Sequence, residues 1–194
     1  MVIFSHGYGE NKGGANKGYS YLMENLASKG YFAASIQHEL ATDSLLPMTG
    51  KPQETRRSNW ERCSENILFV LNEFKKTKPY LDYKHLILIG HSNGGDMTML
   101  FATQHPELVD KVISLDNRRM AFPRTKQPKI YSLRLSDQVA DEGVLPTAEE
   151  QTKYGIKIIK LNNTKHNDMG NDANQEQRKE INNYILSFLN INKQ

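Results

Sequence analysis

Six short apolar segments recur along the chain, and stretches with helical periodicity separate most of them. Each segment has little alternation between polar and apolar side chains, which is typical of strands that are covered on both faces. We expect strands at residues 2–5, 32–37, 85–90, 111–116, 129–135 and 156–161. Strand–helix–strand alternation predicts an α/β fold, a three-layer α/β/α sandwich around a mostly parallel sheet of about six strands.

The apolar spacing of amphipathic helices is strongest near the C-terminus. There the apolar residues have the spacing i, i+3, i+4, i+7, i+8: Ile181, Tyr184, Ile185, Phe188 and Leu189. Further helices are expected at 19–29, 58–76 and 94–104, and the last at 175–189. Capping boxes at 58–61 and 147–150 predict helix starts there. The segment 40–57 has no such pattern, and loops of that length are usually functional or mobile.

The 194 residues are enough for one domain with its own core, so we expect a single domain over 1–194. A net charge of +3 is too small to predict a nucleic-acid partner. No run of 18 apolar residues occurs, so we expect no stable membrane association. The single cysteine, Cys63, excludes an internal disulfide, and the six histidines lack metal-ligand spacing, so we expect no metal site.

The sequence Gly90-His91-Ser92-Asn93-Gly94-Gly95 lies between an apolar strand and a helical stretch. A chain that passes so abruptly from strand to helix turns sharply and presents Ser92 at the tip, in a strained backbone conformation. Side chains at positions 90 and 94 would clash across this turn, which explains the glycines. The helix that follows adds partial positive charge where an oxyanion develops. The pattern predicts that Ser92 is a nucleophile.

A second glycine-rich segment, Ser5-His6-Gly7-Tyr8-Gly9, directly follows the first strand. A tetrahedral oxyanion needs two N–H donors, and they come from different loops. We expect the backbone N–H groups of Tyr8 and Asn93 to form this oxyanion hole. The alternative is a flexible turn with no part in the chemistry.

A general base is expected after the last strand, where His166 precedes the final helix; the alternative is a solvated loop histidine. The acid that orients His166 should follow the strand before last. Asp137 comes directly after that strand and is favoured, because a carboxylate at a strand end is held more firmly than one on a longer excursion. Asp141 is the alternative acid, and Asp116, at the end of the preceding strand, is a third candidate.

These residues together resemble the α/β-hydrolase fold. The match consists of His6-Gly7-Tyr8-Gly9, Gly90-His91-Ser92-Asn93-Gly94, an aspartate and His166, in the order Ser, Asp, His. It covers essentially the whole chain from the family's third strand onward. The pattern looks most like small bacterial esterases of the dienelactone-hydrolase, PET-hydrolase and cutinase-like type. It departs in the acid loop, which is longer and lacks the family's usual glycine shortly before the aspartate.

The resemblance implies a serine hydrolase that cleaves carboxylic esters of small molecules through an acyl-enzyme, without a metal or organic cofactor. A dienelactone hydrolase proper usually has a cysteine nucleophile, so Ser92 argues against that activity. Two alternatives remain. One is a peptidase or acyltransferase on the same triad, and the other is a non-catalytic binding protein with a hydrolase-like fold.

About a dozen residues separate the strands at 111–116 and 129–135, where cap domains of this family are often inserted. We therefore expect no cap and an open cleft, which favours short-chain or polar esters, although segment 40–57 could act as a lid. The candidate substrate contacts are His38, Trp60 and Met48. Six arginines could attract an acidic substrate, but we interpret them as scattered surface charge; they lie at positions 56, 57, 118, 119, 124 and 134.

The chain opens with Met-Val-Ile-Phe-Ser-His-Gly, which is neither a signal peptide nor a transit peptide. A complete chain would be cytoplasmic, whereas a chain that has lost an N-terminal leader would be secreted or periplasmic. The sequence indicates neither the natural substrate nor the oligomeric state.

Overall fold

The computed structural model describes residues 1–135 and 137–190. Within them, six strands form one sheet in the order β2-β1-β3-β4-β5-β6, and every neighbouring pair is parallel. The strands are β1 (Val2–Ser5), β2 (Ala33–Ile36), β3 (Ile87–His91), β4 (Lys111–Leu115), β5 (Lys129–Arg134) and β6 (Lys157–Lys160). The predicted parallel sheet is confirmed, and its strand bounds differ from the expected ones by two residues at most.

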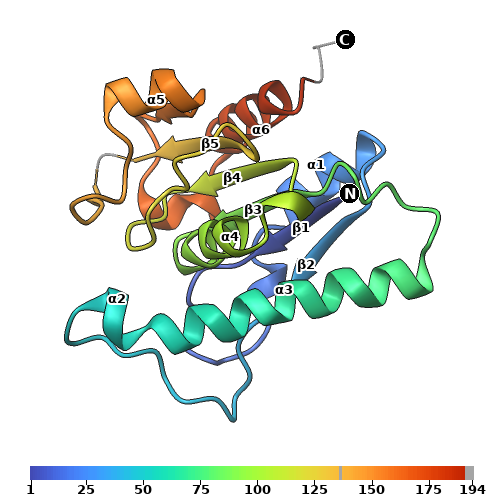
Figure 1. Cartoon of the computed structure of the whole chain (residues 1–194), viewed down its shortest axis with the longest axis horizontal. Coiled ribbons are helices and arrows are strands. Elements are labelled where there is room, and N and C mark those ends of the chain that lie inside the picture. Colours follow the sequence, from blue (N-terminus) through green and yellow to red (C-terminus); the bar gives the residue numbers. More distant parts are fainter. Residues whose placement is uncertain (136, 191–194) are drawn as a thin grey trace.

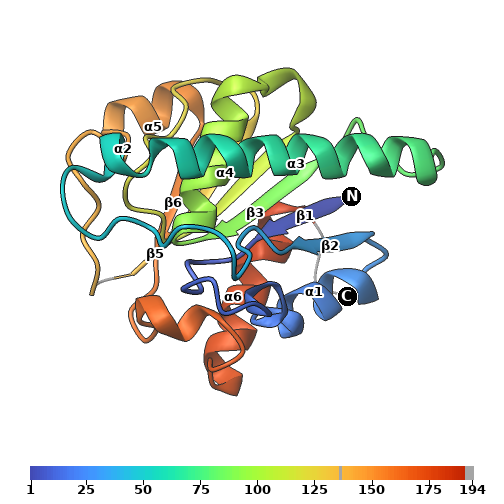
Figure 2. The same ribbon diagram turned by 90° about the horizontal axis from the view of Figure 1, so that it is seen from below.

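Helices cover both faces of the sheet, so the predicted α/β/α sandwich is also confirmed (Figure 1). The helices are α1 (Ser20–Ser28), α2 (Pro52–Thr55), α3 (Arg57–Thr77), α4 (Asn93–Gln104), α5 (Ala148–Tyr154) and α6 (Gln175–Phe188). Figure 2 shows α1 and α6 on one face and α3 and α4 on the other. Among the described residues, no helix is long and apolar enough to cross a bilayer.

The sheet is apolar on both faces because a core lies on each side of it. Along β3, Ile87 and Ile89 pack in the core with α1 and α6, whereas Leu88 packs in the core with α3 and α4. Successive strand residues point to opposite faces, so a strand buried on both sides needs apolar residues at every position. This requirement explains the unbroken apolar run that precedes Ser92.

The two predicted capping boxes have different outcomes. At α5, Thr147 accepts from the N–H of Glu150, and the Glu150 side chain accepts in return, as predicted. At α3 the prediction is wrong, because the helix has already begun at Arg57 and Ser58 lies inside it. The short helix α2 ends at Thr55, and α3 begins at Arg57, so Arg56 is the only residue between the two helices. The unpatterned segment 40–57 therefore contains a helix of its own.

The carboxyl ends of the parallel strands lie at one edge of the sheet. The glycine-rich loop follows β1 there, Ser92 follows β3, and Asp116 follows β4. The connection from β4 to β5 contains no helix, so no cap domain is inserted at that point. Open parallel sheets place their ligand sites at this edge.

Candidate active site

Ser92 occupies the sharp turn between β3 and α4, with φ 52° and ψ −120°. The turn is so tight that a Cβ on Gly90 would lie 2.3 Å from the carbonyl oxygen of Gly94. A Cβ on Gly94 would lie 2.1 Å from the carbonyl oxygen of Ser5, at the end of β1. Any side chain at position 90 or 94 would therefore push the backbone apart. The left-handed conformation of Ser92 costs of order 1–3 kcal/mol and is maintained by this surrounding structure.

His166 lies beside Ser92 in a short turn of 3-10 helix, His166–Met169, that follows β6. The Ser92 hydroxyl donates to His166 Nε2 at 2.9 Å. The imidazole is buried, so water competes little for this contact. A hydroxyl that donates to a neutral imidazole can lose its proton to it as the oxygen attacks an electrophile.

The other side of the imidazole contacts Asp116. His166 Nδ1–H donates to Asp116 Oδ2 at 2.6 Å. Asp116 is fully buried, and its second oxygen forms an ion pair with Arg134 Nη1 at 2.9 Å and accepts from the N–H of Leu135 at 3.2 Å. Both carboxylate oxygens are thus held by donors, which fixes the carboxylate and leaves Nε2 free to face Ser92.

The favoured assignment of the acid to Asp137 is corrected by this geometry, and so is the alternative Asp141. The two Asp137 oxygens accept from the backbone N–H of His166 at 3.0 and 3.2 Å, so Asp137 braces the turn and not the ring. Asp141 pairs with Arg119 instead. The physical reason is that β5 ends at Arg134, so Asp137 lies beyond the strand end, whereas Asp116 directly follows a strand.

A signal for Asp116 was present in the strand register. Leu115 on β4 pairs with Leu133 on β5, so the next residues, Asp116 and Arg134, lie at the same level. Asp116 and Arg134 therefore form a charged pair at the edge of the sheet where the strands end. This pair lies next to β3, the strand that leads to Ser92. A single carboxylate in the sequence does not indicate which arginine lies opposite it, so this signal appears only when β4 and β5 are paired.

The loop after β1 packs directly against Ser92. A Cβ on Gly7 would lie 3.5 Å from the Cβ of Ser92 and 3.0 Å from His91 Nδ1. The backbone N–H groups of Tyr8 and Asn93 donate to no other group in residues 1–135 and 137–190. An oxyanion hole requires N–H donors that are free to bind the oxyanion, so both groups remain candidates for it.

Trp60, predicted as a substrate contact, has another role in this structure. Its indole is fully buried and donates to Asn93 Oδ1 at 2.7 Å. The Asn93 side chain in turn donates to Asn59 at 3.4 Å. Trp60 therefore holds the residue that follows the nucleophile, and it cannot contact a substrate.

The other two predicted substrate contacts also lie outside the pocket. His38 is buried and hydrogen-bonded to the Ser5 hydroxyl at 3.0 Å. Burial lowers the pKa of His38 to about 3, so its ring is neutral. Met48 is 74% exposed, and its sulfur accepts from Arg56 at 3.5 Å. Neither residue is among those that line the cavity beside Ser92.

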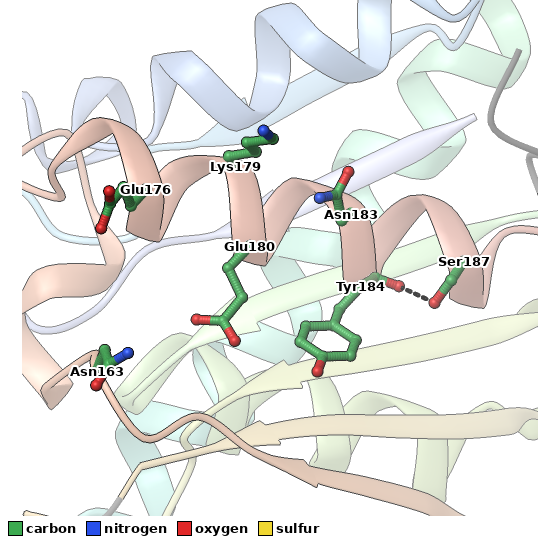
Figure 3. Close-up of a pocket in the computed structure, with 7 residues that line it drawn as sticks. All are labelled: Asn163, Glu176, Lys179, Glu180, Asn183, Tyr184 and Ser187. Carbon is green, nitrogen blue, oxygen red and sulfur yellow. Dashed lines mark hydrogen bonds between the residues drawn. The ribbon is translucent and has the colours of Figure 1, made fainter.

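A cavity of about 300 Å³ opens beside Ser92 and His166. It is lined by small residues and by a few polar groups, among them Gly7, Gly18, Asn167 and Asp172. A larger hollow of about 610 Å³ is lined by residues of α6, among them Glu176, Lys179, Glu180 and Tyr184 (Figure 3). That hollow includes neither Ser92 nor His166, so its size does not connect it to the chemistry.

A chain of hydrogen bonds joins the loop after β1 to the turn of His166. The N–H of Gly7 donates to the Tyr19 hydroxyl at 3.4 Å, and that hydroxyl lies 2.6 Å from His91 Nδ1. His91 Nε2 lies 2.9 Å from the carbonyl oxygen of His166. Burial lowers the pKa of His91 to about 3, so the ring is neutral. Because a carbonyl only accepts, Nε2 carries the proton and Nδ1 accepts from Tyr19.

Tyr19→Phe should lower the free energy of unfolding by about 1–3 kcal/mol, because it leaves the buried Nδ1 of His91 without a donor. Urea unfolding at neutral pH measures the loss. Tyr83→Phe is the control, since the Tyr83 hydroxyl donates to the Lys78 carbonyl at 2.8 Å in a less buried place. Equal losses in the two variants would contradict the buried chain.

Metal-ligating side chains are not grouped in the part of the chain that the structure describes. No three His, Cys, Asp or Glu residues within it could hold one ion. Cys63 is buried, and burial raises the pKa of its thiol to about 12, so the thiol stays protonated. Cys63 is therefore part of the core, next to Trp60 and Met97.

Solved structures with a similar fold include α/β hydrolases and esterases. A hydrolase of the alpha/beta superfamily from Xanthomonas campestris pv. campestris has a TM-score of 0.62 at 11% identity, over 96% of this chain and 98% of that chain. Esterase Est22 has a TM-score of 0.66 at 15% identity, over 96% of this chain and 70% of that chain. The Francisella virulence factor BioJ has a TM-score of 0.68 at 12% identity, over 98% and 76%. No family model matches the chain.

These comparisons confirm the fold that the sequence resemblance implied. The chain has the α/β-hydrolase fold, and its six parallel strands match a minimal form of that fold. Identities this low bear on the fold alone, so the chemistry has to be argued from the site itself.

Proposed function

We propose that this protein is a serine hydrolase that cleaves carboxylic esters. The observation that carries the proposal is the continuous contact from Ser92 Oγ through the imidazole of His166 to Asp116, with distances of 2.9 and 2.6 Å. The esterase and hydrolase neighbours on the same fold support it. The open edge of the sheet and the cavity of about 300 Å³ favour short-chain or polar esters over long acyl chains.

The first half of the reaction would form an acyl-enzyme. Ser92 Oγ attacks the acyl carbonyl while His166 Nε2 takes its proton, and the carbonyl oxygen becomes an oxyanion held by the N–H groups of Tyr8 and Asn93. Asp116 keeps the other imidazole proton on Nδ1 and stabilises the imidazolium. When the tetrahedral intermediate collapses, His166 gives its proton to the leaving alcohol.

The second half repeats these steps with water. Water attacks the acyl carbonyl and gives a proton to His166 Nε2, and the oxyanion forms again at the same donors. Collapse releases the carboxylic acid, and the proton returns to Ser92 Oγ. Arg134 offsets the buried charge of Asp116, which would otherwise be costly to hold in the interior.

A fluorophosphonate probe should label Ser92 covalently, because it reacts with serine hydroxyls that a neighbouring base activates. Peptide mass spectrometry locates the label. Ser92→Ala and His166→Ala are the matched variants, and we expect neither to be labelled. A folded wild-type protein that takes up no label, and hydrolyses no p-nitrophenyl acetate, would favour a non-catalytic binding protein on this fold.

A further inference from the structure

Four arginines from three separate parts of the chain gather beside the proposed active site. Arg134 ends β5, Arg118 and Arg119 lie in the loop after Asp116, and Arg56 joins α2 to α3. In both views the start of β1 lies at one end of the molecule and α2 lies at the opposite end (Figures 1 and 2). The parallel strands end on the side of α2. The structure thus corrects the interpretation of these arginines as scattered charge.

Gln138 connects two of the four arginines. Its side-chain oxygen accepts from Arg118, and its carbonyl oxygen accepts from Arg134 Nη2 at 3.2 Å. Arg134 also binds the carboxylate of Asp116, at 2.9 Å. Arg118 is therefore linked through Gln138 and Arg134 to the acid that contacts His166.

Asp141 links the loop that carries Arg118 and Arg119 to α2, which Arg56 directly follows. Its carboxylate pairs with Arg119, and its N–H donates to the carbonyl oxygen of Arg118 at 2.9 Å. Gln53 of α2 donates to the second oxygen of Asp141 at 2.6 Å. This contact attaches α2 to the loop after β4 and brings Arg56, which directly follows α2, to the same place.

The charges of Arg56 and Arg118 are not balanced within the described residues, where neither has a carboxylate within 4.0 Å. Arg56 Nε donates to the carbonyl oxygen of Pro47 at 2.9 Å, and Arg118 donates to the neutral amide of Gln138. Burial lowers the pKa of Arg56, and the positive charges of Arg119 and Arg118 lower it further, while the nearby carboxylate of Asp96 opposes this by raising it. A bound anion would relieve this repulsion.

Neither Arg56 nor Arg118 lines the cavity beside Ser92, but both are close in the contact network to groups that we propose take part in the reaction, so they would bind a part of the substrate that extends beyond this cavity. Arg118 is two residues beyond Asp116. The carbonyl that accepts from Arg56 belongs to the residue after Leu46, and the N–H of Leu46 donates to the Tyr8 hydroxyl at 3.0 Å. Tyr8 lines the cavity beside Ser92.

We propose that Arg56 and Arg118 bind a carboxylate on the substrate, so that the preferred substrates are esters that carry a negative charge. The proposal rests on the proposed esterase function. Guanidinium groups bind carboxylates through charge-assisted hydrogen bonds and suit planar, bidentate recognition. Salt screens exposed charges, so the preference for anionic esters should weaken as ionic strength rises.

The test compares kcat/KM for two matched pairs of esters at low ionic strength. Mono-p-nitrophenyl adipate and p-nitrophenyl hexanoate differ by a charge on the acyl side. 4-Acetoxybenzoate and 4-acetoxybenzamide differ by a charge on the alcohol side. We expect the anionic member to be favoured about tenfold or more in one pair, and that pair identifies which side carries the charge.

Arg56→Gln and Arg118→Gln should each lower the ratio of anionic to neutral kcat/KM by about tenfold. Arg57→Gln is the matched control, because it removes the same charge from the next position, where Arg57 pairs with Glu61 at 2.6 Å. We expect its ratio to equal that of the wild type. A wild-type ratio near one in both pairs, or an equal fall in Arg57→Gln, would overturn the proposal.

The outcome for the substrate class can be separated from the outcome for the function. Hydrolysis that depends on Ser92 but shows no preference for either anionic ester would reject the anion site and leave the esterase proposal in place. Failure to hydrolyse all four esters, together with failure to take up the fluorophosphonate probe, would contradict both.

Discussion

Asp116→Asn should lower kcat toward p-nitrophenyl acetate by about four orders of magnitude. An asparagine amide can donate to Nδ1 of His166, which favours the tautomer with its proton on Nε2. That tautomer cannot take the proton of Ser92. The loss should therefore be mainly in kcat, with a smaller change in KM. Steady-state kinetics measures both constants.

Asp137→Asn is the matched control for this prediction. An asparagine at 137 keeps an oxygen that can accept from the backbone N–H of His166, so kcat should stay within about tenfold of the wild type. Asp116 also pairs with Arg134, so circular dichroism and a melting curve should accompany the kinetics of both variants. A larger loss in Asp137→Asn than in Asp116→Asn would restore Asp137 as the acid.

Ser92→Ala should have the largest effect on turnover, with a fall in kcat of about six orders of magnitude. Alanine keeps the backbone but has no oxygen to attack the ester, so only binding and the oxyanion donors remain. The fall should reach the detection limit of a p-nitrophenyl acetate assay. Ser35→Ala, which removes a serine hydroxyl that donates to the Asn16 carbonyl at 2.7 Å, should keep its activity.

The double variant Ser92→Ala/Asp116→Asn makes this prediction sharper. Residues that act as one unit are not additive, so the double variant should be no slower than Ser92→Ala alone. A further loss of several orders of magnitude in the double variant would mean that Asp116 acts independently of Ser92. Purified protein free of host esterases is needed, because residual rates this low are easily exceeded by contamination.

Much of the fold could be predicted because its signals are local. The apolar run before Ser92 indicates a strand covered on both faces, and the spacing from Ile181 to Leu189 indicates a helix with one buried face. The start of α3 could not be predicted in the same way. The sequence 58–61 has the residues of a capping box, but the helix continues back to Arg57 next to α2.

The acid could not be predicted from local sequence because it depends on which strand end faces His166. Asp137 follows one predicted strand, and Asp116 is the last residue of another. In the structure β5 ends at Arg134, so the chain has left the sheet before it reaches Asp137. The arginines show the same limit, since residues 56, 118 and 134 become neighbours only when α2, β4 and β5 share one edge.

Two of the three contacting residues, Ser92 and Asp116, have left-handed backbone conformations, with φ of 52° and 58°. Neither is glycine, so a free chain would seldom visit either conformation. The surrounding structure therefore holds both residues in place, at a cost to folding stability of order 1–3 kcal/mol each. Selection for heat resistance alone would favour glycine at both positions and would thereby remove the hydroxyl and the carboxylate on which turnover depends.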